Sequence, residues 1–427
     1  MITPSDITVV GLGYVGLPLA LAFAEEFSTT GFDIDQARVQ QLSDGFDRNL
    51  EVDSSEINSS ELQLTNDPAC ISESSFIVVT VPTPVTDDFQ PDLSLLESAS
   101  RLIGEQLRGR SNESMTPTIV FESTTYPGCT EDFCGPLIEK ESGLKSSEGF
   151  LLGYSPERTN YGDSEHTLET VVKVVAGQTA EAADVISDVY SRIAKAGTHL
   201  VADIRTAEAS KVIENVQRDL NIALFNESAM IFDRMGINSA EVFEAAATKW
   251  NFHRYQPGLV GGHCIPVDPY YLTYAAQEVG QQAQVILSGR NVNEGMTDRV
   301  VEKIDELVSE GGRDVSTSRL LVLGQTFKKD VADFRNSKAK ELAAKLRSRF
   351  ADVRTYDPFD KGSESIQDPF ESGHKYDAVV VAVGHSHFTA RPNALSALIE
   401  PQGVFVDLVG AADPKLFRNP DVRYWSL

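Results

Sequence analysis

The sequence predicts an α/β fold made of two doubly wound parallel-sheet domains joined by a long central helix. Short β-branched runs alternate with helical periods over about the first 200 residues, and the same alternation returns beyond residue 310. One unbroken helical period covers Arg205–Met235 between them. A chain of 427 residues is long enough for two or three domains, and we expect their boundaries at 1–200, 201–310 and 311–427.

The first predicted strand, Ile7–Val10, runs into the glycine-rich turn Gly11–Gly16, and an amphipathic helix over Leu17–Glu26 follows. A second strand ends at Asp33, about 20 residues past the glycines. A strand, G-x-G-x-x-G, a helix, a strand and an acid in this order form the dinucleotide fingerprint of a Rossmann-like domain. An ordinary tight strand-to-helix turn is the alternative interpretation.

Each residue of this fingerprint has a distinct task. Gly11 makes the turn, Gly13 admits the pyrophosphate and Gly16 lets the helix pack on the strand. Asp33 accepts hydrogen bonds from the ribose hydroxyls and its charge repels a 2′-phosphate, which favours NAD over NADP. Arg38 is a candidate for the adenosine side, and a solvated helix charge is its alternative.

The alternation continues with strands over Phe76–Val81 and Thr118–Phe121 and a helix over Leu93–Arg108 between them. Because the carboxyl ends of the strands form the ligand crevice of a doubly wound sheet, Thr83 and Thr124 are expected near the nicotinamide. A turn-capping hydroxyl is the alternative for both threonines.

Two further segments carry candidate catalytic groups. A strand over Phe150–Tyr154 leads to Glu157, which would act as a general base if partly desolvated, whereas the alternative is a surface glutamate. On the long helix, Lys211 and Asn215 are four residues apart and share one face. The alternative interpretation is that this face is solvated and has no catalytic role. This helix has more apolar positions than one domain face needs, which predicts a homodimer or a higher homo-oligomer.

The most unusual stretch precedes Cys264. Gly258, Gly261 and Gly262 let the backbone bend tightly and approach a ligand closely. Asp268 follows four residues after the cysteine, so one loop offers a soft nucleophile and a carboxylate. The alternative for Cys264 is a small buried hydrophobic residue.

A second α/β domain follows a helix over about Asn291–Ser309. Its predicted elements are a strand over Arg319–Gly324, a helix over Lys338–Arg349, and strands over Asp352–Asp357, Ala378–Val383 and Gly403–Asp407. Gly324 is not followed by the rest of a dinucleotide motif, so this domain is expected to bind a different ligand. Three basic residues in an otherwise acidic chain, Lys328, Lys329 and Arg335, favour a ligand that carries phosphates.

Composition excludes several classes of function. The chain has 37 Lys and Arg against 63 Asp and Glu, and this net charge of −26 disfavours nucleic acids and anionic membranes. The four cysteines show no metal-ligand spacing, so we expect reduced thiols and no metal. No apolar run approaches ~18 residues and no basic leader is visible, and we expect a cytoplasmic protein.

Six motifs carry a resemblance to a known family: GLGYVGLP, ESTTYPGCTED, SPERTN, the Lys211/Asn215 helix, GGHCIPVDP and FKKDVADFRNS. In this order, and over nearly the whole chain, they resemble the UDP-glucose/GDP-mannose dehydrogenase family. Within it the sequence is similar to the UDP-N-acetylhexosamine 6-dehydrogenases of bacterial surface polysaccharide synthesis, especially the Vi-antigen type acting on UDP-N-acetylglucosamine. The galacto and manno epimers and UDP-glucose are the alternative substrates.

The resemblance implies a four-electron oxidation of the sugar C6 alcohol to a carboxylate by two NAD⁺ at one active site. It assigns the alcohol proton to Lys211 and Asp268, through a water held with Thr124, and it assigns the developing oxyanion to Lys211 and Asn215. Cys264 would then form a thiohemiacetal with the aldehyde, and a second oxidation would give a thioester.

The resemblance further implies that water activated by Glu157 hydrolyses this thioester. The implied cofactor-binding residues are Gly11, Gly13, Tyr14, Val15, Gly16, Asp33, Arg38, Thr83, Thr124 and Arg335. The implied substrate-binding residues are Glu157, Arg158, Asn160, Lys211, Asn215, Arg254, Tyr255, Gly258, Gly261, Cys264, Phe327 and Lys328.

The sequence departs from the UDP-glucose dehydrogenase pattern at two positions. Tyr161 replaces a second glutamate four residues after Glu157, and His263 replaces a small residue before the cysteine. Both changes disfavour UDP-glucose, and Arg158 or Asn160 would supply a hydrogen-bond partner for an acetamido group at C2.

Two alternatives from other classes remain at this stage. A single-step dehydrogenase of the 6-phosphogluconate type shares the amino-terminal fold and a Lys/Asn helix, but it has no use for Cys264. A non-catalytic nucleotide-sugar sensor would have no need to retain Cys264, Lys211 and Asp268.

Overall fold

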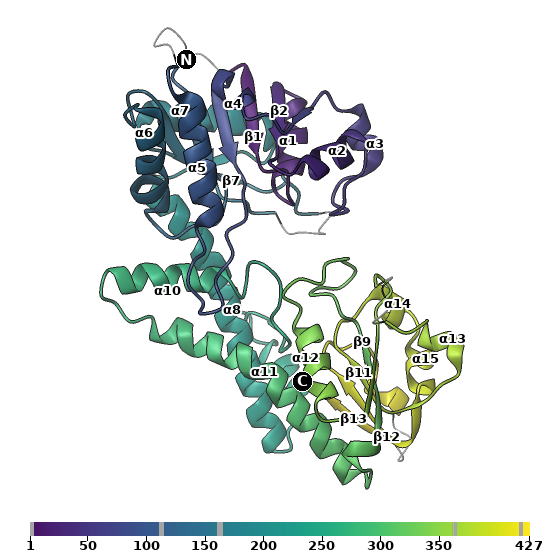
Figure 1. Ribbon diagram of the computed structural model, residues 1–427. Helices are drawn as coiled ribbons and strands as arrows, with labels where there is room; N and C mark the ends of the chain where they lie inside the picture. Colours follow the sequence, from purple (N-terminus) through teal and green to yellow (C-terminus); the bar gives the residue numbers. More distant parts are fainter. Residues whose placement is uncertain (1–3, 111–114, 160–164, 361, 363–364, 418–421) are drawn as a thin grey trace. The chain divides into compact units, whose positions relative to one another are not determined.

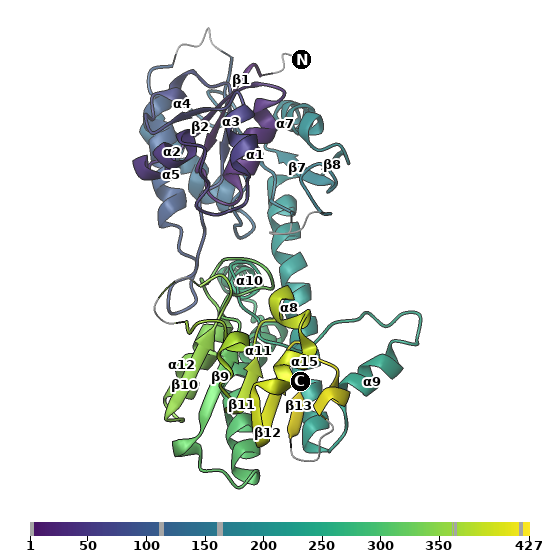
Figure 2. The same cartoon turned by 90° about the vertical axis from the view of Figure 1, so that its right-hand side faces the viewer.

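The computed structural model describes residues 4–110, 115–159, 165–360, 362, 365–417 and 422–427. The chain forms two compact units. The first unit comprises Met1–Asn215 and Val267–Gln282, and the second comprises Val216–Pro266 and Ala283–Leu427. Figures 1 and 2 show both units and label many of their elements.

In the described part of the first unit, eight strands form one sheet in the order β3-β2-β1-β4-β5-β6-β7-β8. Their bounds are β1 Asp6–Val10, β2 Ser28–Phe32, β3 Gln63–Thr65, β4 Phe76–Val79, β5 Thr118–Phe121, β6 Leu151–Tyr154, β7 Lys173–Gly177 and β8 Thr198–Leu200. The pairs from β3 to β6 are parallel, and the strand order changes direction beside β1, the place where doubly wound sheets bind ligands. Strand β7 runs antiparallel to β6, with Tyr154 opposite Ala176.

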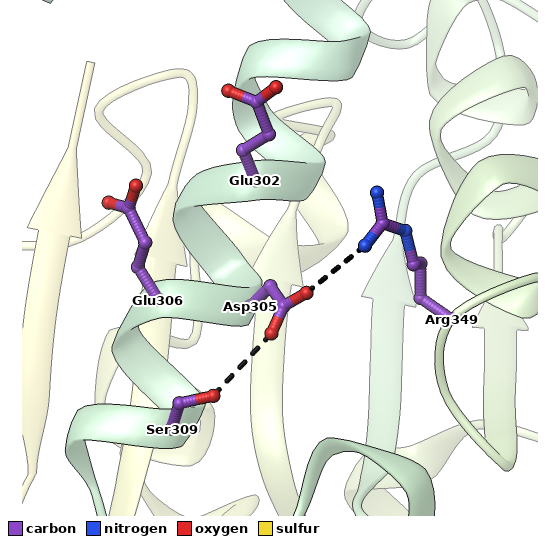
Figure 3. A pocket seen from close by; sticks show the side chains of 5 residues that line it. All are labelled: Glu302, Asp305, Glu306, Ser309 and Arg349. Carbon is purple, nitrogen blue, oxygen red and sulfur yellow. Dashed lines mark hydrogen bonds and ion pairs between the residues drawn. The ribbon is translucent and has the colours of Figure 1, made fainter.

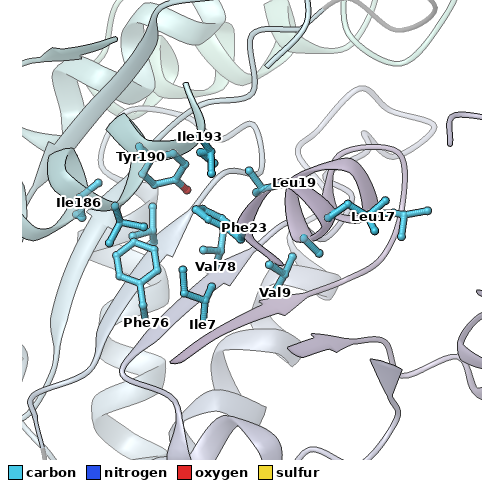
Figure 4. Packing of buried hydrophobic residues seen from close by; sticks show 14 of the residues in the cluster. Ile7, Val9, Leu17, Leu19, Phe23, Phe76, Val78, Ile186, Tyr190 and Ile193 are labelled. Atoms are coloured by element: carbon cyan, nitrogen blue, oxygen red, sulfur yellow. The ribbon is translucent and has the colours of Figure 1, made fainter. Parts of the chain in front are cut away.

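Helices cover both faces of this sheet. Those in the amino-terminal part of the unit are α1 Gly16–Ala24, α2 Gln36–Ser43, α3 Ser54–Ser59, α4 Cys70–Glu73, α5 Ser94–Leu107, α6 Gly135–Ser142 and α7 Ala180–Ile193. The helix α10, Asp268–Glu278, also belongs to this unit and packs through Tyr271 on Val212 of the long helix and on loop residues beyond β4 and β5. Side chains alternate across β4, so Phe76 and Val78 join one buried cluster with α1 and α7, while Ile77 and Val79 join another with α5 and α6. Figure 4 shows the first cluster, where the ring of Phe23 packs edge-on against its aromatic neighbours.

The long helix α8 spans Ile204–Arg234, so the prediction of a helix over 205–235 is confirmed to within one residue at each end. Its first part, up to Asn215, belongs to the first unit, and its remainder belongs to the second.

In the described part of the second unit, five parallel strands form a sheet in the order β10-β9-β11-β12-β13 (Figure 2). The strand bounds are β9 Arg319–Leu323, β10 Asp352–Tyr356, β11 Tyr376–Val381, β12 Ile399–Asp407 and β13 Arg423–Ser426. The helices are α9 Ser239–Ala246, α11 Gln284–Glu310, α12 Lys338–Arg347, α13 Pro369–Ser372, α14 Ser386–Thr389 and α15 Pro392–Ala397. One buried cluster joins α11 and α12 to one sheet face, and another joins α14 and α15 to the opposite face.

The two sheets share the same turn after their first strand. In the first unit, Gly11 has a φ of 97° and its N–H donates to the Phe32 carbonyl at 2.8 Å, while the N–H of Leu12 donates to Asp33 at 2.8 Å. A positive φ of this size is a conformation that glycine adopts without strain.

The second unit repeats these contacts at different residues. Gly324 has a φ of 88° and its N–H donates to the Tyr356 carbonyl at 2.8 Å, while the N–H of Gln325 donates to Asp357 at 2.5 Å. In both sheets the acid that follows the second strand therefore holds the turn after the first.

The predicted α/β fold with two parallel-sheet domains is confirmed, although the bounds and the number of elements differ from the expectation. Strand β4 ends at Val79 rather than Val81, and α11 begins at Gln284, seven residues before the expected start at Asn291. Several elements were not predicted, among them the strands β3, β7, β8 and β13 and the helices α2, α6, α7, α9 and α10. The β7 pattern was missed because Lys173 interrupts its apolar run, although this lysine is itself buried.

We predict that Phe23→Ala destabilises the first unit by roughly 3–5 kcal/mol, because it removes a fully buried aromatic ring and leaves a cavity between α1 and α7. Urea unfolding followed by circular dichroism measures this change. The matched control, Leu95→Ala on the surface of α5, removes a side chain that is 44% exposed and should change stability by at most about 0.5 kcal/mol. Equal losses in the two variants would contradict the prediction.

Candidate functional site

The glycine turn of the first unit has the shape that a dinucleotide needs. A side chain built on Gly13 would meet no atom within 4 Å, so this position leaves open space above the turn. A β-carbon on Gly16 would come within 1.8 Å of the Gly11 carbonyl oxygen, so only glycine allows α1 to start this close to β1. These features fit the pyrophosphate of NAD.

Asp33 and Arg38 flank this turn. Asp33 is half-buried and accepts backbone N–H groups from Leu12 at 2.8 Å and Asp35 at 2.9 Å. Arg38 is only 1% exposed, and its side chain donates to the Leu12 carbonyl and pairs with Asp47 at 2.8 Å. The interpretation of Arg38 as a solvated helix charge is therefore wrong, because its guanidinium group is buried beneath the turn.

The other predicted cofactor residues of this unit lie near the same edge of the sheet. Tyr14 and Val15 are half-buried in the glycine turn. Thr83 and Thr124 follow β4 and β5 and are also half-buried. Because β1, β4 and β5 are parallel neighbours, their carboxyl ends bring these residues to one edge.

Four predicted catalytic residues come together in the first unit. The ammonium group of Lys211 donates to the backbone carbonyl of Glu157 at 2.6 Å, and the Asn215 amide donates to the Asp268 carboxylate at 2.6 Å. Lys211, Asn215 and Asp268 are all buried. A solvated helix face is therefore the wrong interpretation for Lys211 and Asn215.

The two carboxylates of this group differ in their affinity for protons. Burial raises the pKa of Asp268 to about 6, although the charge of Lys211 and the hydrogen bond from Asn215 oppose the shift. Burial also raises the pKa of Glu157, but the charge of Lys173 and hydrogen bonds from the Thr159 N–H and hydroxyl outweigh it, so the net pKa lies below its ordinary value. Asp268 thus exchanges its proton near neutral pH, whereas Glu157 is held as an anion.

In the second unit, Cys264 lies at the end of a tightly held loop. Its side chain is exposed and unbonded to another cysteine, so a buried hydrophobic residue is the wrong interpretation. The N–H of Gly262 donates to the Asn336 carbonyl at 3.2 Å, and a β-carbon on Gly262 would lie 2.8 Å from the Phe327 ring. The glycines are therefore needed where the loop packs against Phe327.

His263, the residue before the cysteine, is held by a charged cluster. Its Nε2 lies 3.1 Å from the carboxylate of Asp333, which also accepts two hydrogen bonds from the Arg335 guanidinium at 3.0 and 2.7 Å. Burial raises the pKa of Asp333, but the hydrogen bonds from His263 and Arg335 outweigh it and hold the net pKa well below the usual range. Arg335, a predicted cofactor residue, is thus anchored beside the cysteine loop.

Hydrogen bonds from side chains of α8 hold the loop that precedes the cysteine. The Asn226 side chain accepts the Gly258 N–H at 2.7 Å and donates to the Gly258 carbonyl at 3.1 Å, and Gln217 donates to the Tyr255 hydroxyl at 3.0 Å. The N–H groups of Gly258 and Gly262 are therefore already bonded within the protein.

The remaining predicted substrate residues of the second unit differ in exposure. Arg254 is exposed, whereas Gly261, Phe327 and Lys328 are half-buried. A β-carbon on Gly261 would lie 2.7 Å from the Asn336 carbonyl oxygen, so this glycine permits a close approach of two backbones.

Two residues of the Glu157 turn, Asn160 and Tyr161, lie outside the described residues. Arg158 is described, and its guanidinium pairs with Glu214 of α8 at 2.6 Å. An acetamido group near Arg158 would therefore share that side chain with a carboxylate.

A surface depression on α11 is unrelated to these residues. Figure 3 shows its lining side chains, which are Glu302, Asp305, Glu306, Ser309 and Arg349. The lining holds three carboxylates and one guanidinium, and Arg349 pairs with Asp305 at 3.5 Å. Their negative charge disfavours a nucleotide ligand, so the depression is not the candidate site.

Two absences concern the described residues alone. Among them, no group of three or more His, Cys, Asp or Glu side chains could hold a metal ion. No helix in the same part of the chain is long and apolar enough to cross a membrane.

Family models match three successive segments. The models describe the UDP-glucose/GDP-mannose dehydrogenase family, and they cover its NAD binding domain at residues 5–194, its central domain at 205–295 and its UDP binding domain at 321–414.

Related proteins decide the family. The chain is 44% identical to a UDP-N-acetyl-D-glucosamine 6-dehydrogenase of Pseudomonas aeruginosa, over 90% of this chain and 91% of that protein. The chain belongs to the UDP-glucose/GDP-mannose dehydrogenase family. A UDP-N-acetyl-D-glucosamine 6-dehydrogenase of Salmonella typhi is 43% identical over 90% of each chain. The solved UDP-N-acetyl-D-mannosamine dehydrogenase of Pyrococcus horikoshii superposes with a TM-score of 0.86 at 30% identity, covering 98% of each chain.

Membership of the UDP-glucose/GDP-mannose dehydrogenase family gives the class of reaction. The protein is an NAD-dependent nucleotide-sugar 6-dehydrogenase, and its substrate is a UDP-sugar. This excludes the two alternatives of a single-step 6-phosphogluconate-type enzyme and a non-catalytic sensor.

Sequence reasoning missed several residues that hold the site in this dehydrogenase. Asn226 and Asp333 fix the cysteine loop, and Glu208 of α8 accepts the N–H groups of Gly128 and Thr130 beyond β5. Asn226 and Glu208 lie on the predicted long helix and Asp333 lies within FKKDVADFRNS, but none of them was given a role there. A polar residue at a core position of an amphipathic pattern, as Glu208 is on α8, was the available signal.

We predict that Asp268→Asn stabilises the protein at pH 8 by roughly 2–3 kcal/mol, because burial raises the folded-state pKa of this carboxyl from 3.8 to about 6. Between pH 4 and 6 the folded chain binds this proton more tightly than the unfolded chain, so the native protein loses stability as the pH rises through that window. Denaturant unfolding at pH 5.5 and 8 measures the difference in free energy of unfolding between Asp268→Asn and the native protein. This difference should be larger at pH 8.

The control for Asp268 is Asp203→Asn at the start of α8. Hydrogen bonds from the Thr206 N–H and hydroxyl lower the pKa of this exposed carboxyl. Its ionised form therefore does not destabilise the folded protein, and Asp203→Asn should give no gain in stability at pH 8. A pH-independent effect of Asp268→Asn would contradict the prediction.

Proposed function

We propose that this dehydrogenase oxidises C6 of UDP-N-acetylglucosamine in preference to other UDP-sugars, and that the uronic acid serves a surface polysaccharide. The observation that carries this proposal is the sequence identity of 44% and 43% to two enzymes named for that sugar, against 32% to a Pyrococcus horikoshii protein named for the manno epimer. UDP-N-acetylgalactosamine, UDP-N-acetylmannosamine and UDP-glucose are the alternatives.

In the proposed first oxidation, Asp268 takes the proton of the C6 alcohol through a water held with Thr124. A base of pKa about 6 is matched to work near neutral pH. Lys211 and Asn215, which contact Glu157 and Asp268, place an ammonium and an amide group beside the developing oxyanion. NAD, when bound, accepts one hydride in each of the two oxidations.

In the proposed second stage, the Cys264 sulfur adds to the aldehyde carbon and the carbonyl oxygen takes up a proton, which gives a thiohemiacetal. Its oxidation gives a thioester on Cys264. Exposure of this thiol in the second unit supports a nucleophilic role over a packing role.

Glu157 is proposed to complete the reaction. A water molecule attacks the thioester carbonyl, its proton passes to the Glu157 carboxylate, and the carbon–sulfur bond breaks to release the acid and the Cys264 thiol. The lowered pKa of Glu157 keeps this carboxylate ionised at neutral pH, which is the state that a general base requires, although the same shift makes it a weaker base than Asp268.

The uridine diphosphate is proposed to bind the second unit along residues 254–262 and the Phe327–Lys328 segment. The charge of Lys328 favours the diphosphate, and the ring of Phe327 packs on the Gly262 backbone. Because the N–H groups of Gly258 and Gly262 are engaged within the protein, Lys328 and Arg254 carry more of the expected affinity.

Domain roles and assembly are also proposals. Residues 1–200 would bind NAD, 201–310 would carry the catalytic helix and the subunit contact, and 311–427 would bind the UDP-sugar. Exposed apolar side chains along α8 support a homodimer or higher oligomer: Ile213 is 51% exposed, Leu224 58%, Ile231 50% and Met235 64%.

We predict that Cys264→Ala lowers uronic acid formation by at least about 10³-fold, because the second oxidation loses its covalent nucleophile. The Kd for NAD should stay within about twofold, since the glycine turn lies in the first unit. Chromatography of the acid and fluorescence titration of NAD measure these quantities. Cys70→Ala, which removes another free thiol, is the control, and full activity of Cys264→Ala would refute the mechanism.

We predict at least ~100-fold higher kcat/KM for UDP-N-acetylglucosamine than for UDP-glucose, because a site that pairs the acetamido group is left with unpaired polar groups by glucose. A panel of four UDP-sugars, followed by NADH absorbance, measures this ratio and should return two NADH per sugar. Comparable turnover of UDP-glucose, or one NADH per sugar at completion, would overturn the substrate assignment.

A further inference from the structure

A buried lysine lies behind the proposed catalytic carboxylate of the first unit. The side chain of Lys173, in β7, is 2% exposed, and its ammonium group lies 2.5 Å from the Glu122 carboxylate and donates to the Pro156 carbonyl at 3.0 Å. The hydroxyl of Tyr190 donates to the other oxygen of Glu122 at 2.5 Å. The mechanism described above uses none of Lys173, Glu122 and Tyr190.

The antiparallel direction of β7 explains how Lys173 reaches this place. Tyr154 of β6 stands opposite Ala176, and continuing this register by three residues places Glu157 opposite Lys173. The first residue of β7 therefore lies where β6 ends, at the ligand-binding edge of the sheet. The ammonium group of Lys173 lies 4.0 Å from the Glu157 carboxylate, and the peptide oxygen it binds belongs to the preceding residue, Pro156.

The charges around Glu157 come from several elements. From β7 it faces Lys173, and from α8 it faces Lys211, whose charge also lowers its pKa. Glu122, which follows β5, opposes this effect, and its own pKa is raised by burial. Two further described residues lie near Glu157: the phenol of Tyr190 on α7 has its pKa raised by burial and donates to Glu122, and the guanidinium group of Arg158 pairs with Glu214.

Packing alone does not account for this arrangement. Burying an ammonium group and a carboxylate is unfavourable, and apolar side chains of similar size usually fill such a place without loss of stability. The surrounding cluster is apolar and aromatic, as Figure 4 shows around Tyr190. A charged residue at this position therefore points to a role at the neighbouring carboxylate.

We propose that Lys173 is a positioning residue of the reaction: held by Glu122 and the Pro156 carbonyl, its ammonium group fixes the Glu157 carboxylate in place as an anion for thioester hydrolysis. This inference rests on the proposed role of Glu157 as the base of that step. Lys173 is buried between Glu122 and Glu157, and this role requires no contact between its side chain and the substrate or cofactor.

The test follows hydrolysis of the Cys264 adduct in the full-length enzyme with NAD and UDP-N-acetylglucosamine. Acid-quenched samples are analysed by intact mass spectrometry between pH 5.5 and 8. In the native enzyme the hydrolysis rate should be independent of pH over this range. In Lys173→Met the pH of half-maximal hydrolysis should rise by about 1–3 units, because an opposite charge near 4 Å lowers a carboxyl pKa by that amount.

Further variants keep the test decisive. Lys173→Met combined with Glu122→Gln avoids an unpaired buried carboxylate and should show the same shift if the single variant does not fold. Lys173→Arg keeps the charge and should restore pH-independent hydrolysis at least in part. Lys195→Met removes an exposed ion pair with Glu169 and should behave as the native enzyme.

The outcomes separate this inference from the function on which it rests. If Glu157→Gln hydrolyses the adduct normally, the proposed role of Glu157 fails. If Glu157→Gln accumulates the adduct but the Lys173 variants keep the native pH profile and adduct level, the role of Lys173 alone is overturned. A rise in KM for either ligand without a change in hydrolysis would likewise overturn it, because it would indicate a structural effect.

Discussion

Parallel strand pairing is the constraint on which the chemistry of this dehydrogenase depends. Parallel neighbours bring all their carboxyl ends to one edge of a sheet. Residues that are distant in the sequence therefore lie near one another at that edge because of the strand direction alone. The glycine turn after β1, Thr83 after β4, Thr124 after β5 and Glu157 after β6 are all placed in this way. The antiparallel β7 adds a group to the same edge from its first residue rather than its last.

Buried charge is the second theme of the first unit. Four charged or titratable residues, Lys211, Asp268, Lys173 and Glu122, are buried, although each would be better solvated at the surface. Oxidation of the alcohol and the proposed hydrolysis of a thioester both move protons and develop negative charge on the oxygen bonded to C6. Groups that already carry charge in a dry environment stabilise such changes more strongly than hydrated ones, because little solvent has to reorganise.

The sequence was most informative where a residue type has one physical explanation. The glycines, Asp33 and the helical period of α8 identify their elements because turn geometry, ribose binding and helix spacing each allow few alternatives. It was least informative where side chains meet through the fold alone. Lys173 received no role from the sequence, and a solvated charge stayed open for Arg38, because only the sheet register and the packing of α2 reveal their burial.

The repeated turn of the two sheets has a consequence for how the enzyme keeps two nucleotides apart. Asp33 is half-buried and borders the open space above Gly13, whereas Asp357 is sealed by the N–H groups of Gln325 and Thr326 and by the buried His385 imidazole at 3.1 Å. Asp357 is therefore already engaged where Asp33 in the first sheet remains half-exposed. Because a ribose needs an accessible carboxylate, the buried His385 makes the turn of the second sheet a poorer place for a dinucleotide than the turn of the first.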